Sequence, residues 1–301
     1  MPVISAVMAL YNTPYNYLKA TVQSILNQTF KDFELIVIDD ASSEDYAEFF
    51  ERFNDERIKY TKLEKNAGPG HARNTGIMLA LGEFVAIVDS DDVYMNNRFK
   101  LQLDFMNKNP EISLISGAFK QSNNGKIPCV VENNEDIKLS MLFNSPLANP
   151  LIMFRKNFFI ENNLFYPENI NFAEDYELWI DAMFVGAKIA NLKDVLMIYT
   201  RRKGQLSKEK SDKQTTILKG LYKKIFSKIG INPSKEELDL HCNIAMEKLD
   251  SASVQQINGW FDKIIENNQL IEIFEEQKLV QKKEKILDKL NQSKNKLRRS
   301  E

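Results

Sequence analysis

The sequence contains few of the residues that build disulfide frameworks or nitrogen- and sulfur-based metal sites. Its 301 residues include two cysteines, Cys129 and Cys242, and two histidines, His71 and His241. The cysteines lie far apart without CxxC spacing, which disfavours a disulfide scaffold or a cysteine-based zinc site and fits a reducing compartment. Two histidines cannot form a histidine-rich cage. Any metal must therefore be held by oxygen ligands.

Long apolar runs and a surplus of charge are also missing. No stretch is long and apolar enough to span a bilayer, and no basic segment precedes the apolar residues 1–11, as it would in a signal peptide. The formal net charge of -2 disfavours nucleic acid as the main partner, because nucleic acid would favour a clearly basic face. We therefore expect a cytoplasmic protein with no nucleic-acid partner, for which the cytoplasmic face of the membrane is at most a neighbour.

The first half of the chain alternates apolar runs, typical of buried strands, with segments of helical periodicity. Helices are expected after Thr13-Pro14, after Ser42-Ser43 and over residues 72–81. This alternation predicts an α/β fold, with an open, mostly parallel sheet and helices on both faces. The expected strands cover residues 3–9, 33–38, 57–63 and 83–88.

Farther along, the pattern becomes mixed and then purely helical. After Gly204 only helical patterns remain, with helix starts at Pro233-Ser234 and Asp250-Ser251. We therefore expect an α/β domain over residues 1–207 and a helical C-terminal extension over residues 208–301. Strands are expected at residues 112–118, 150–154 and 195–201, and helices at 136–143, 174–184 and 269–297.

Polar side chains follow the ends of three expected strands. They are Asn12, the pair Asp39-Asp40, and the run Asp89-Ser90-Asp91-Asp92. Because ligands bind at the carboxyl ends of the strands in such sheets, the three clusters are expected to converge on one crevice.

The acidic run 89–92 has two interpretations. Its three carboxylates repel one another unless a cation or solvent lies among them, and a divalent ion held there could also bind a diphosphate. The alternative is a helix cap followed by a solvated turn. An EF-hand loop is excluded, because its glycine and glutamate positions hold Tyr94 and Lys100.

Two further segments carry candidate residues. Gly68-Pro69-Gly70 begins like a dinucleotide-binding fingerprint but lacks its third glycine, which disfavours a Rossmann dehydrogenase. Arg73 either lies near a phosphate or is a surface arginine in a first helical turn. Glu174 and Asp175 either interact favourably with a helix dipole or include a general base.

Six segments, in this order, resemble those of the family-2 glycosyltransferases, which have the GT-A fold. That fold is a Rossmann-like, mostly parallel sheet with helices on both faces. The resemblance covers roughly residues 3 to 207, and the ordered set is far more specific than any one segment. The matching segments are residues 9–12, 24–30, 33–42, 66–76, 89–92 and 173–179.

The resemblance implies a UDP-sugar donor and a role for each matching residue near it. Asp40 would accept hydrogen bonds from uracil, and Ala9 and Tyr11 would line the base pocket. Arg73 would lie near the base and the phosphates. Asp89 would contact the ribose or the sugar.

The resemblance also implies a metal and a base. Asp91, with Asp92 close by, would ligate Mn²⁺ or Mg²⁺ bridging the diphosphate. Asp175, with Glu174 beside it, would deprotonate the acceptor hydroxyl, and one displacement would invert the anomeric centre. A glycosidase would instead need two carboxylates flanking the bond. Many relatives have a histidine where this chain has Arg202, which has no lone pair for a metal and would bind the diphosphate instead.

Residues 149–155, the segment 173–179 and the helical tail look like bacterial β-1,3-N-acetylhexosaminyltransferases that extend lipooligosaccharide or capsule. The acceptor implied is a glycan or a lipid-linked glycan. Two other functions stay open. A sugar-1-phosphate nucleotidyltransferase should have a Gly- and Arg-rich loop where this chain has residues 11–14, and a non-catalytic sugar-nucleotide-binding module would tolerate loss of Asp91 or Asp175.

The C-terminal tail is rich in charge of both signs. Residues 275–301 contain nine Lys or Arg and five Asp or Glu. This mixture favours a helix packed on the domain, or an oligomer contact, over a helix lying on an anionic membrane. The apolar residues that could share one face are Leu270, Phe274, Ile286, Leu287, Leu290 and Leu297.

Overall fold

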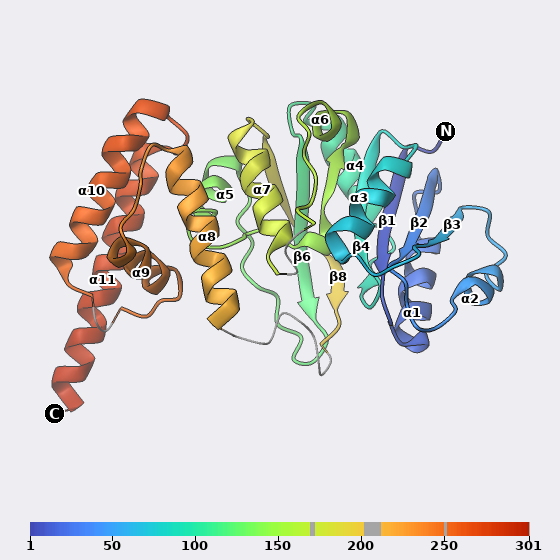
Figure 1. Ribbon diagram of the computed structural model, residues 1–301, viewed down its shortest axis with the longest axis horizontal. Coiled ribbons are helices and arrows are strands. Elements are labelled where there is room, and N and C mark those ends of the chain that lie inside the picture. The colour runs from blue at the N-terminus through green and yellow to red at the C-terminus, as the bar shows by residue number, and fades with distance from the viewer. Residues whose placement is uncertain (169–171, 202–211, 250–251, 301) are drawn as a thin grey trace. The chain divides into compact units, whose positions relative to one another are not determined.

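The computed structural model describes residues 1–168, 172–201, 212–249 and 252–300 (Figure 1). Its contacts divide the chain into two compact units, residues 1–133 with 147–208 and residues 134–146 with 209–301. The sequence pattern predicts a boundary after residue 207. The division differs in the segment 134–146, which groups with the C-terminal unit.

The first unit is built on an eight-stranded sheet in the order β3-β2-β1-β4-β7-β6-β8-β5. Four neighbouring strands run parallel: β1 (Ile4–Leu10), β2 (Phe33–Asp39), β3 (Ile58–Lys62) and β4 (Phe84–Asp89). All but β3 are almost wholly buried, which explains their unbroken apolar runs. The expected strands are confirmed within a few residues at each end.

The other four strands make the sheet mixed. β7 (Met153–Arg155) pairs antiparallel with β4 and with β6 (Leu114–Gln121). β6 runs parallel to β8 (Ile189–Tyr199), and the short β5 (Val93–Tyr94) pairs antiparallel with β8. β5 follows the acidic run directly and ties it to the end of β8.

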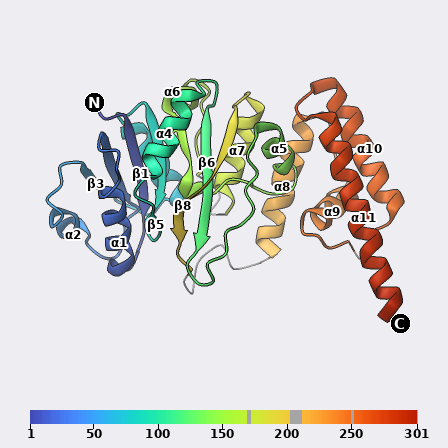
Figure 2. The same ribbon diagram turned by 180° about the vertical axis from the view of Figure 1, so that it is seen from behind.

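Helices cover both faces of the sheet, as expected. α3 (Pro69–Leu79) and α7 (Glu174–Phe184) lie over the face seen in Figure 1, and α1 (Tyr15–Leu26) and α4 (Arg98–Lys108) over the face seen in Figure 2. α3 packs closely on β1, because a Cβ at Gly76 would lie 2.4 Å from a side-chain carbon of Val7. That contact brings the first turn of α3 to the carboxyl end of the sheet.

Several elements differ from the expectation. α2 (Ala47–Glu51) begins later than expected, since the Ser42 hydroxyl accepts a hydrogen bond from the Asn12 amide instead of capping a helix. α4, β5 and α6 (Lys156–Glu161) were not expected, and β8 begins before residue 195.

The second unit is helical in its described residues. Ser234 and Ser253 form capping boxes at the starts of α9 and α10. The start expected at residues 250–251 falls outside the described residues, and the helix begins shortly after them. The helices are α5 (Asn134–Ser140), α8 (Asp212–Lys228), α9 (Lys235–Ala245), α10 (Val254–Ile271) and α11 (Glu276–Ser300).

The apolar face of the tail packs inside this unit. Phe274, Ile286 and Leu290 are 3%, 6% and 0% exposed, and α11 lies against α10. Leu270, by contrast, is 84% exposed, and the side chain of Leu297 lies outside the described part. The packed-helix interpretation is therefore favoured for this face. No helix among the described residues is long and apolar enough to cross a bilayer.

Candidate active site

The acidic run at the end of β4 is a turn whose backbone is held by the side chains of two other residues. The Asp89 amide donates to the Tyr94 hydroxyl at 2.7 Å. The buried Thr21 hydroxyl of α1 contacts the carbonyl oxygens of Ser90 at 3.1 Å and Asp92 at 2.7 Å. These bonds fix the backbone of residues 89–92 and so set the directions of its carboxylates.

The carboxylates of this turn have different surroundings. Asp92 is 0% exposed, and its Oδ1 accepts a hydrogen bond from the Thr200 amide at 2.7 Å. The side chain of Asp89 is 31% exposed and faces Arg73, and Asp91 is partly exposed. Asp92 therefore braces the turn against the end of β8, while Asp89 and Asp91 remain accessible to a ligand.

A buried arginine lies behind the turn. Arg98 is 0% exposed, and its Nη2 donates to the Ile87 carbonyl oxygen at 3.0 Å. Its guanidinium carbon lies 4.7 Å from the centre of the Tyr94 ring. Burial lowers the pKa of Arg98 to about 10, so the side chain stays charged at neutral pH. Sequence reasoning missed this residue, because no local pattern distinguishes it from a surface arginine.

The two aspartates after β2 organise loops. Asp40 is 3% exposed, and its two carboxylate oxygens accept the amides of Ala67 and Gly68, each at 2.8 Å. Gly68 has a φ of 91°, a conformation that favours glycine. Asp39 accepts the Ser42 amide and the Tyr60 hydroxyl. Asp40 thus holds the loop that starts α3, and its predicted contact with uracil stays a prediction.

The end of β1 contributes the residues predicted to line a base pocket. Ala9 pairs in register with Ile38 on one side and Asp89 on the other, so it lies at the same edge of the sheet as the acidic turn. Tyr11 follows and is 53% exposed. Asn12 adopts a left-handed backbone with a φ of 48°. This edge therefore presents an accessible aromatic ring beside the strand ends.

Arg73 links two of the predicted clusters. Its Nη2 lies 3.1 Å from Asp89 Oδ1, and its Nη1 lies 2.8 Å from Glu174 Oε1. The side chain is 9% exposed and lies over the Tyr166 ring, 5.3 Å from its centre. Burial alone would lower the pKa of Arg73, but Asp89, Tyr166 and Glu174 raise it well above its usual value. Its Nε has no hydrogen-bond partner within the described part of the chain.

Asp175 follows at the first turn of α7. Burial, and then the charge of Glu174, raise the pKa of Asp175 from 3.8 to about 6, although Arg73 opposes the shift. Asp175 Oδ1 accepts the Tyr176 amide at 2.8 Å. Ala173, just before the helix, has a left-handed φ of 59°, which is costly for a residue with a Cβ. The chain is therefore strained at the point that sets the direction of these acids.

Tyr166, which the sequence analysis also did not single out, lies beneath the Arg73 guanidinium. Its hydroxyl donates to Asn149 Oδ1 at 2.8 Å, and its backbone exchanges two hydrogen bonds with the Asn74 side chain at 2.8 and 2.9 Å. Asn74 comes directly after Arg73. The segment under the guanidinium is thus tied to the helix that carries it.

The predicted residues fall into groups in the structure. Hydrogen bonds link Arg73, Asp89 and Glu174 directly, and Asp175 is the neighbour of Glu174. Ala9, Tyr11 and Asp40 lie at the same sheet edge, as do Asp91 and Asp92. Arg202 lies outside the residues that the structure describes. Within those residues, no three His, Cys, Asp or Glu side chains are grouped to hold a metal by themselves.

Comparisons with known proteins agree with this arrangement. Residues 5–166 match the family described as Glycosyl transferase family 2. TarS of S. aureus, solved in complex with UDP-GlcNAc, superposes with a TM-score of 0.66 and 21% identity, covering 100% of this chain and 93% of that chain. This likeness confirms the expected GT-A fold class.

Curated relatives extend the match. An uncharacterized glycosyltransferase of Methanocaldococcus jannaschii is 32% identical over 222 residues, covering 70% of this chain and 76% of that protein. A UDP-Glc:alpha-D-GlcNAc-diphosphoundecaprenol beta-1,3-glucosyltransferase of Escherichia coli is 31% identical and covers 60% and 69%. An uncharacterized glycosyltransferase of Rickettsia bellii is 35% identical, but the chain spans only 26% of its length. This chain belongs to glycosyl transferase family 2.

Proposed function

We propose that the chain transfers a hexosyl or N-acetylhexosaminyl group from a UDP-sugar to a hydroxyl of a glycan or lipid-linked glycan, with inversion at the anomeric carbon. Asp175 is the general base and Glu174 its neighbour. The donor lies along the carboxyl edge of β1, β2 and β4, among Ala9, Tyr11 and Asp40.

One observation carries this proposal. The Arg73 guanidinium bridges Asp89, on the donor side, and Glu174, beside the base, through contacts of 3.1 and 2.8 Å. One buried cation therefore contacts both the residue assigned to the donor and the neighbour of the residue assigned as base. Among the described residues, its buried Nε–H also lacks a hydrogen-bond partner.

The donor set suits a hard divalent ion that takes most of its ligands from the diphosphate. Asp91 is a partly exposed carboxylate in the turn after β4, with Asp92 beside it, and Mg²⁺ commonly binds one or two carboxylates together with substrate phosphates. Bound there, Mn²⁺ or Mg²⁺ would neutralise charge on the leaving diphosphate. Asp92 braces the turn through Thr200. Arg202 is proposed to add fixed positive charge near the diphosphate.

The base assignment rests on location and basicity. A carboxylate with a pKa of about 6 is ionised at pH 7 and more basic than an ordinary aspartate. Glu174 is held in an ion pair with Arg73 at 2.8 Å, and we assign the base role to its neighbour Asp175. Asp175 therefore accepts the proton as the acceptor oxygen attacks the anomeric carbon.

The acceptor class follows from one relative's name. The Escherichia coli relative acts on a sugar linked through a diphosphate to undecaprenol. Similarity over 60% of this chain supports a lipid-linked glycan acceptor for this protein too. The cytoplasmic location, the membrane contact and an oligomer through the C-terminal helices remain predictions.

A donor panel tests the proposal. Purified protein is incubated with each of several UDP-sugars, with and without Mn²⁺, and UDP is measured; a separate incubation with UTP and a sugar 1-phosphate is assayed for pyrophosphate. We expect metal-stimulated release of UDP from one or two donors. Absence of UDP release from every donor by a folded protein would count against transfer, and release of pyrophosphate from a sugar phosphate and UTP would indicate a nucleotidyltransferase.

A further inference from the structure

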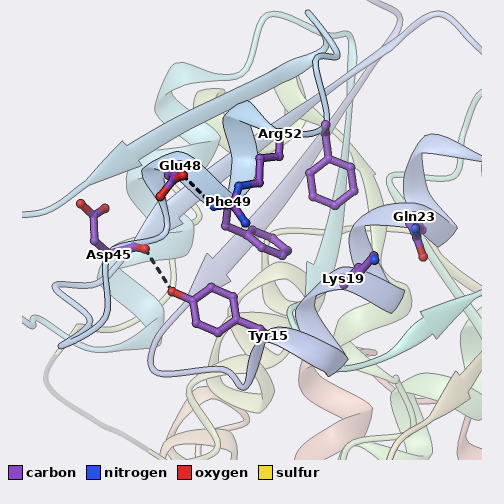
Figure 3. Close-up of a pocket in the computed structure, with 8 residues that line it drawn as sticks. Tyr15, Lys19, Gln23, Asp45, Glu48, Phe49 and Arg52 are labelled. Carbon is purple, nitrogen blue, oxygen red and sulfur yellow. Dashed lines mark hydrogen bonds and ion pairs between the residues drawn. The ribbon is translucent and has the colours of Figure 1, made fainter.

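A groove lies between α1 and the α2 region of the first unit, apart from the residues assigned to donor and base. It encloses about 630 Å³, within the range of about 300–1,000 Å³ that ligand pockets occupy. Figure 3 shows side chains from the two sides facing each other across it. They are Tyr15, Lys19 and Gln23 from α1, and Glu48, Phe49 and Arg52 from the other side.

Aromatic rings form the apolar part of this groove. The Tyr15 and Phe49 ring centres are 5.4 Å apart, and those of Phe49 and Phe53 are 5.3 Å apart. Tyr15 is 43% exposed, although its ring also lies 5.1 Å from that of the buried Tyr46. The rings are thus held rigidly from behind while part of their surface remains open to a ligand.

The rim is polar but has no net charge. Lys19 and Arg52 carry the positive charges. Asp45 and Glu48 carry the negative ones, and Glu48 already pairs with Arg52 at 2.6 Å. A phosphate or a nucleotide would gain little from such a rim. The rim offers hydrogen-bond donors and acceptors in about equal measure, which suits an uncharged ligand with many hydroxyls.

The groove begins where the donor edge ends. Tyr15 opens the helix after the loop that follows β1, and Asp45 lies in the loop that follows β2. The Tyr15 hydroxyl donates to the Asp45 carbonyl oxygen at 3.1 Å, and the Asn12 amide donates to Ser42 Oγ at 2.9 Å. A chain bound in the groove would therefore lie close to the loops that frame the donor.

We propose that this groove binds neutral sugar units of the glycan on which the protein acts, remote from the reacting hydroxyl. Sugar rings have apolar C–H faces, which the negative faces of aromatic rings attract, and equatorial hydroxyls, which the rim groups can bind. The groove raises affinity for long acceptors over short ones, because a second contact on one chain acts at high effective concentration. This proposal rests on the proposed transferase function for its acceptor.

Binding is tested with sugars alone. Neutral oligomers of β-linked glucose and of β-linked N-acetylglucosamine, two to six units long, are titrated into isotopically labelled full-length protein and followed by NMR. We expect chemical-shift changes at α1 and α2. Tyr15→Ala, which removes one ring, should weaken binding about tenfold, the effect of losing about 1.4 kcal/mol of stacking. Gln23→Trp places a bulky side chain in the path of the bound sugars and should weaken binding by steric exclusion.

Controls separate this proposal from the transferase proposal. Met78→Trp places an indole on the exposed end of α3 and should leave oligomer binding unchanged, since Met78 is 62% exposed and lies outside the groove. UDP release from the donor is measured for the same variants and should remain within twofold of the parent protein. If no oligomer binds, or if Gln23→Trp binds oligomers normally, the groove proposal is wrong. If UDP release fails in the parent protein, the transferase proposal fails instead.

Discussion

Each of the two units of this protein buries a polar side chain among other residues, which together form a polar centre. The two side chains differ in whether all of their hydrogen-bonding atoms have partners. In the first unit, Arg73 is charged, bridges two carboxylates and keeps one buried N–H without a partner among the described residues. In the second unit, His241 is 0% exposed and uses both ring nitrogens. One centre is charged and incomplete, and the other is neutral and complete.

The centre of the second unit shows what a purely structural arrangement looks like. His241 Nε2 contacts the Leu142 carbonyl oxygen at 2.6 Å, and Nδ1 accepts from Trp260 Nε1 at 3.1 Å. The rings of Phe143 and Phe226 pack against it. Burial lowers the pKa of His241 to about 4, so the ring is neutral at pH 7.

This difference in hydrogen bonding distinguishes a residue that could bind a ligand, Arg73, from one that only packs the interior, His241. Buried polar groups without partners cost about 1–3 kcal/mol each, so a ligand that completes their hydrogen bonds gains that free energy. A donor and an acceptor that complete the hydrogen bonds of Arg73 and Asp175 would gain it. His241 gains nothing further from a ligand, because both of its ring nitrogens already have partners.

The largest expected effect tests the incomplete centre. Asp175→Asn should lower transfer about 10²–10⁴-fold, since general base catalysis contributes that much, while donor binding stays unchanged. Transfer by the parent protein should also fall as the pH drops through about 6, the pKa of Asp175. Turnover is measured by product formation with an acceptor, and the donor dissociation constant by calorimetry. Near-normal turnover of the variant would show that another group removes the proton.

The next effect tests the complete centre. His241→Phe should lower the free energy of unfolding of the second unit by about 2–4 kcal/mol, because Leu142 O and Trp260 Nε1 both lose their partner. Trp260→Phe is the control for loss of one of the two bonds, and its unfolding is followed by circular dichroism because it lacks the reporting indole. The second unit contains Trp260 and the first contains Trp179. Urea unfolding of the parent and of His241→Phe is therefore followed by fluorescence in a Trp179→Phe background.

The same variant has a pH signature. The unfolded histidine takes up a proton below about pH 6.5, whereas the folded one stays neutral to about pH 4. The histidine's contribution is therefore fully present above pH 6.5 and is lost as the pH falls toward 4. The difference in stability between parent and variant should shrink over that interval. A difference independent of pH would contradict the assignment of His241 as a buried neutral ring.

The strands and their polar ends could be predicted from the sequence because the signals are local. The apolar runs of β1, β2 and β4 each end in polar residues, and the residues of α7 carry a helical period that gave its bounds without error. Each signal needs only the residues of its own segment. The parallel order of these strands then places their carboxyl ends together.

What could not be predicted depends on contacts between distant residues. The buried Arg98 and Gln102 break the apolar period of α4, and both donate to carbonyl groups of remote segments. The segment 134–146 joins the second unit through contacts such as that of Leu142 with His241, ninety-nine positions away. Asp92 has the residue type of a metal ligand, and only its bond to Thr200 shows that it braces the turn.

A smaller effect tests whether the acidic turn has distinct roles along its length. Asp91→Ala should weaken metal-dependent binding of UDP about tenfold, with little change in the free energy of unfolding, because the side chain is partly exposed. Asp92→Ala is the comparison, and it should lower stability more than affinity, because it removes the buried oxygen that accepts the Thr200 amide. Binding is measured by calorimetry with and without Mn²⁺. Equal UDP affinity for the parent and Asp91→Ala would remove Asp91 as a ligand.

The smallest expected effect is on stability. It tests whether the buried charge of Asp175 lowers the free energy of unfolding of the first unit. The pKa of Asp175 is raised from 3.8 to about 6 on folding, so the ionised form is disfavoured in the folded state. Stability therefore rises as the pH falls from 7 through 6, where the folded carboxyl takes up a proton that the unfolded one does not. Asp175→Asn removes the buried charge and should stabilise the first unit by about 1 kcal/mol at pH 7, after allowance for partial exposure.

The gain of the asparagine variant should shrink near pH 5, where the parent is itself largely protonated when folded. Thermal unfolding at both pH values measures this difference, and Asp181→Asn on the same helix serves as the control for loss of an acidic charge. If Asp175→Asn were less stable than the parent at pH 7, Arg73 and the helix start would be holding the carboxylate favourably. The contrast between an incomplete centre and a complete one would then apply to Arg73 Nε alone.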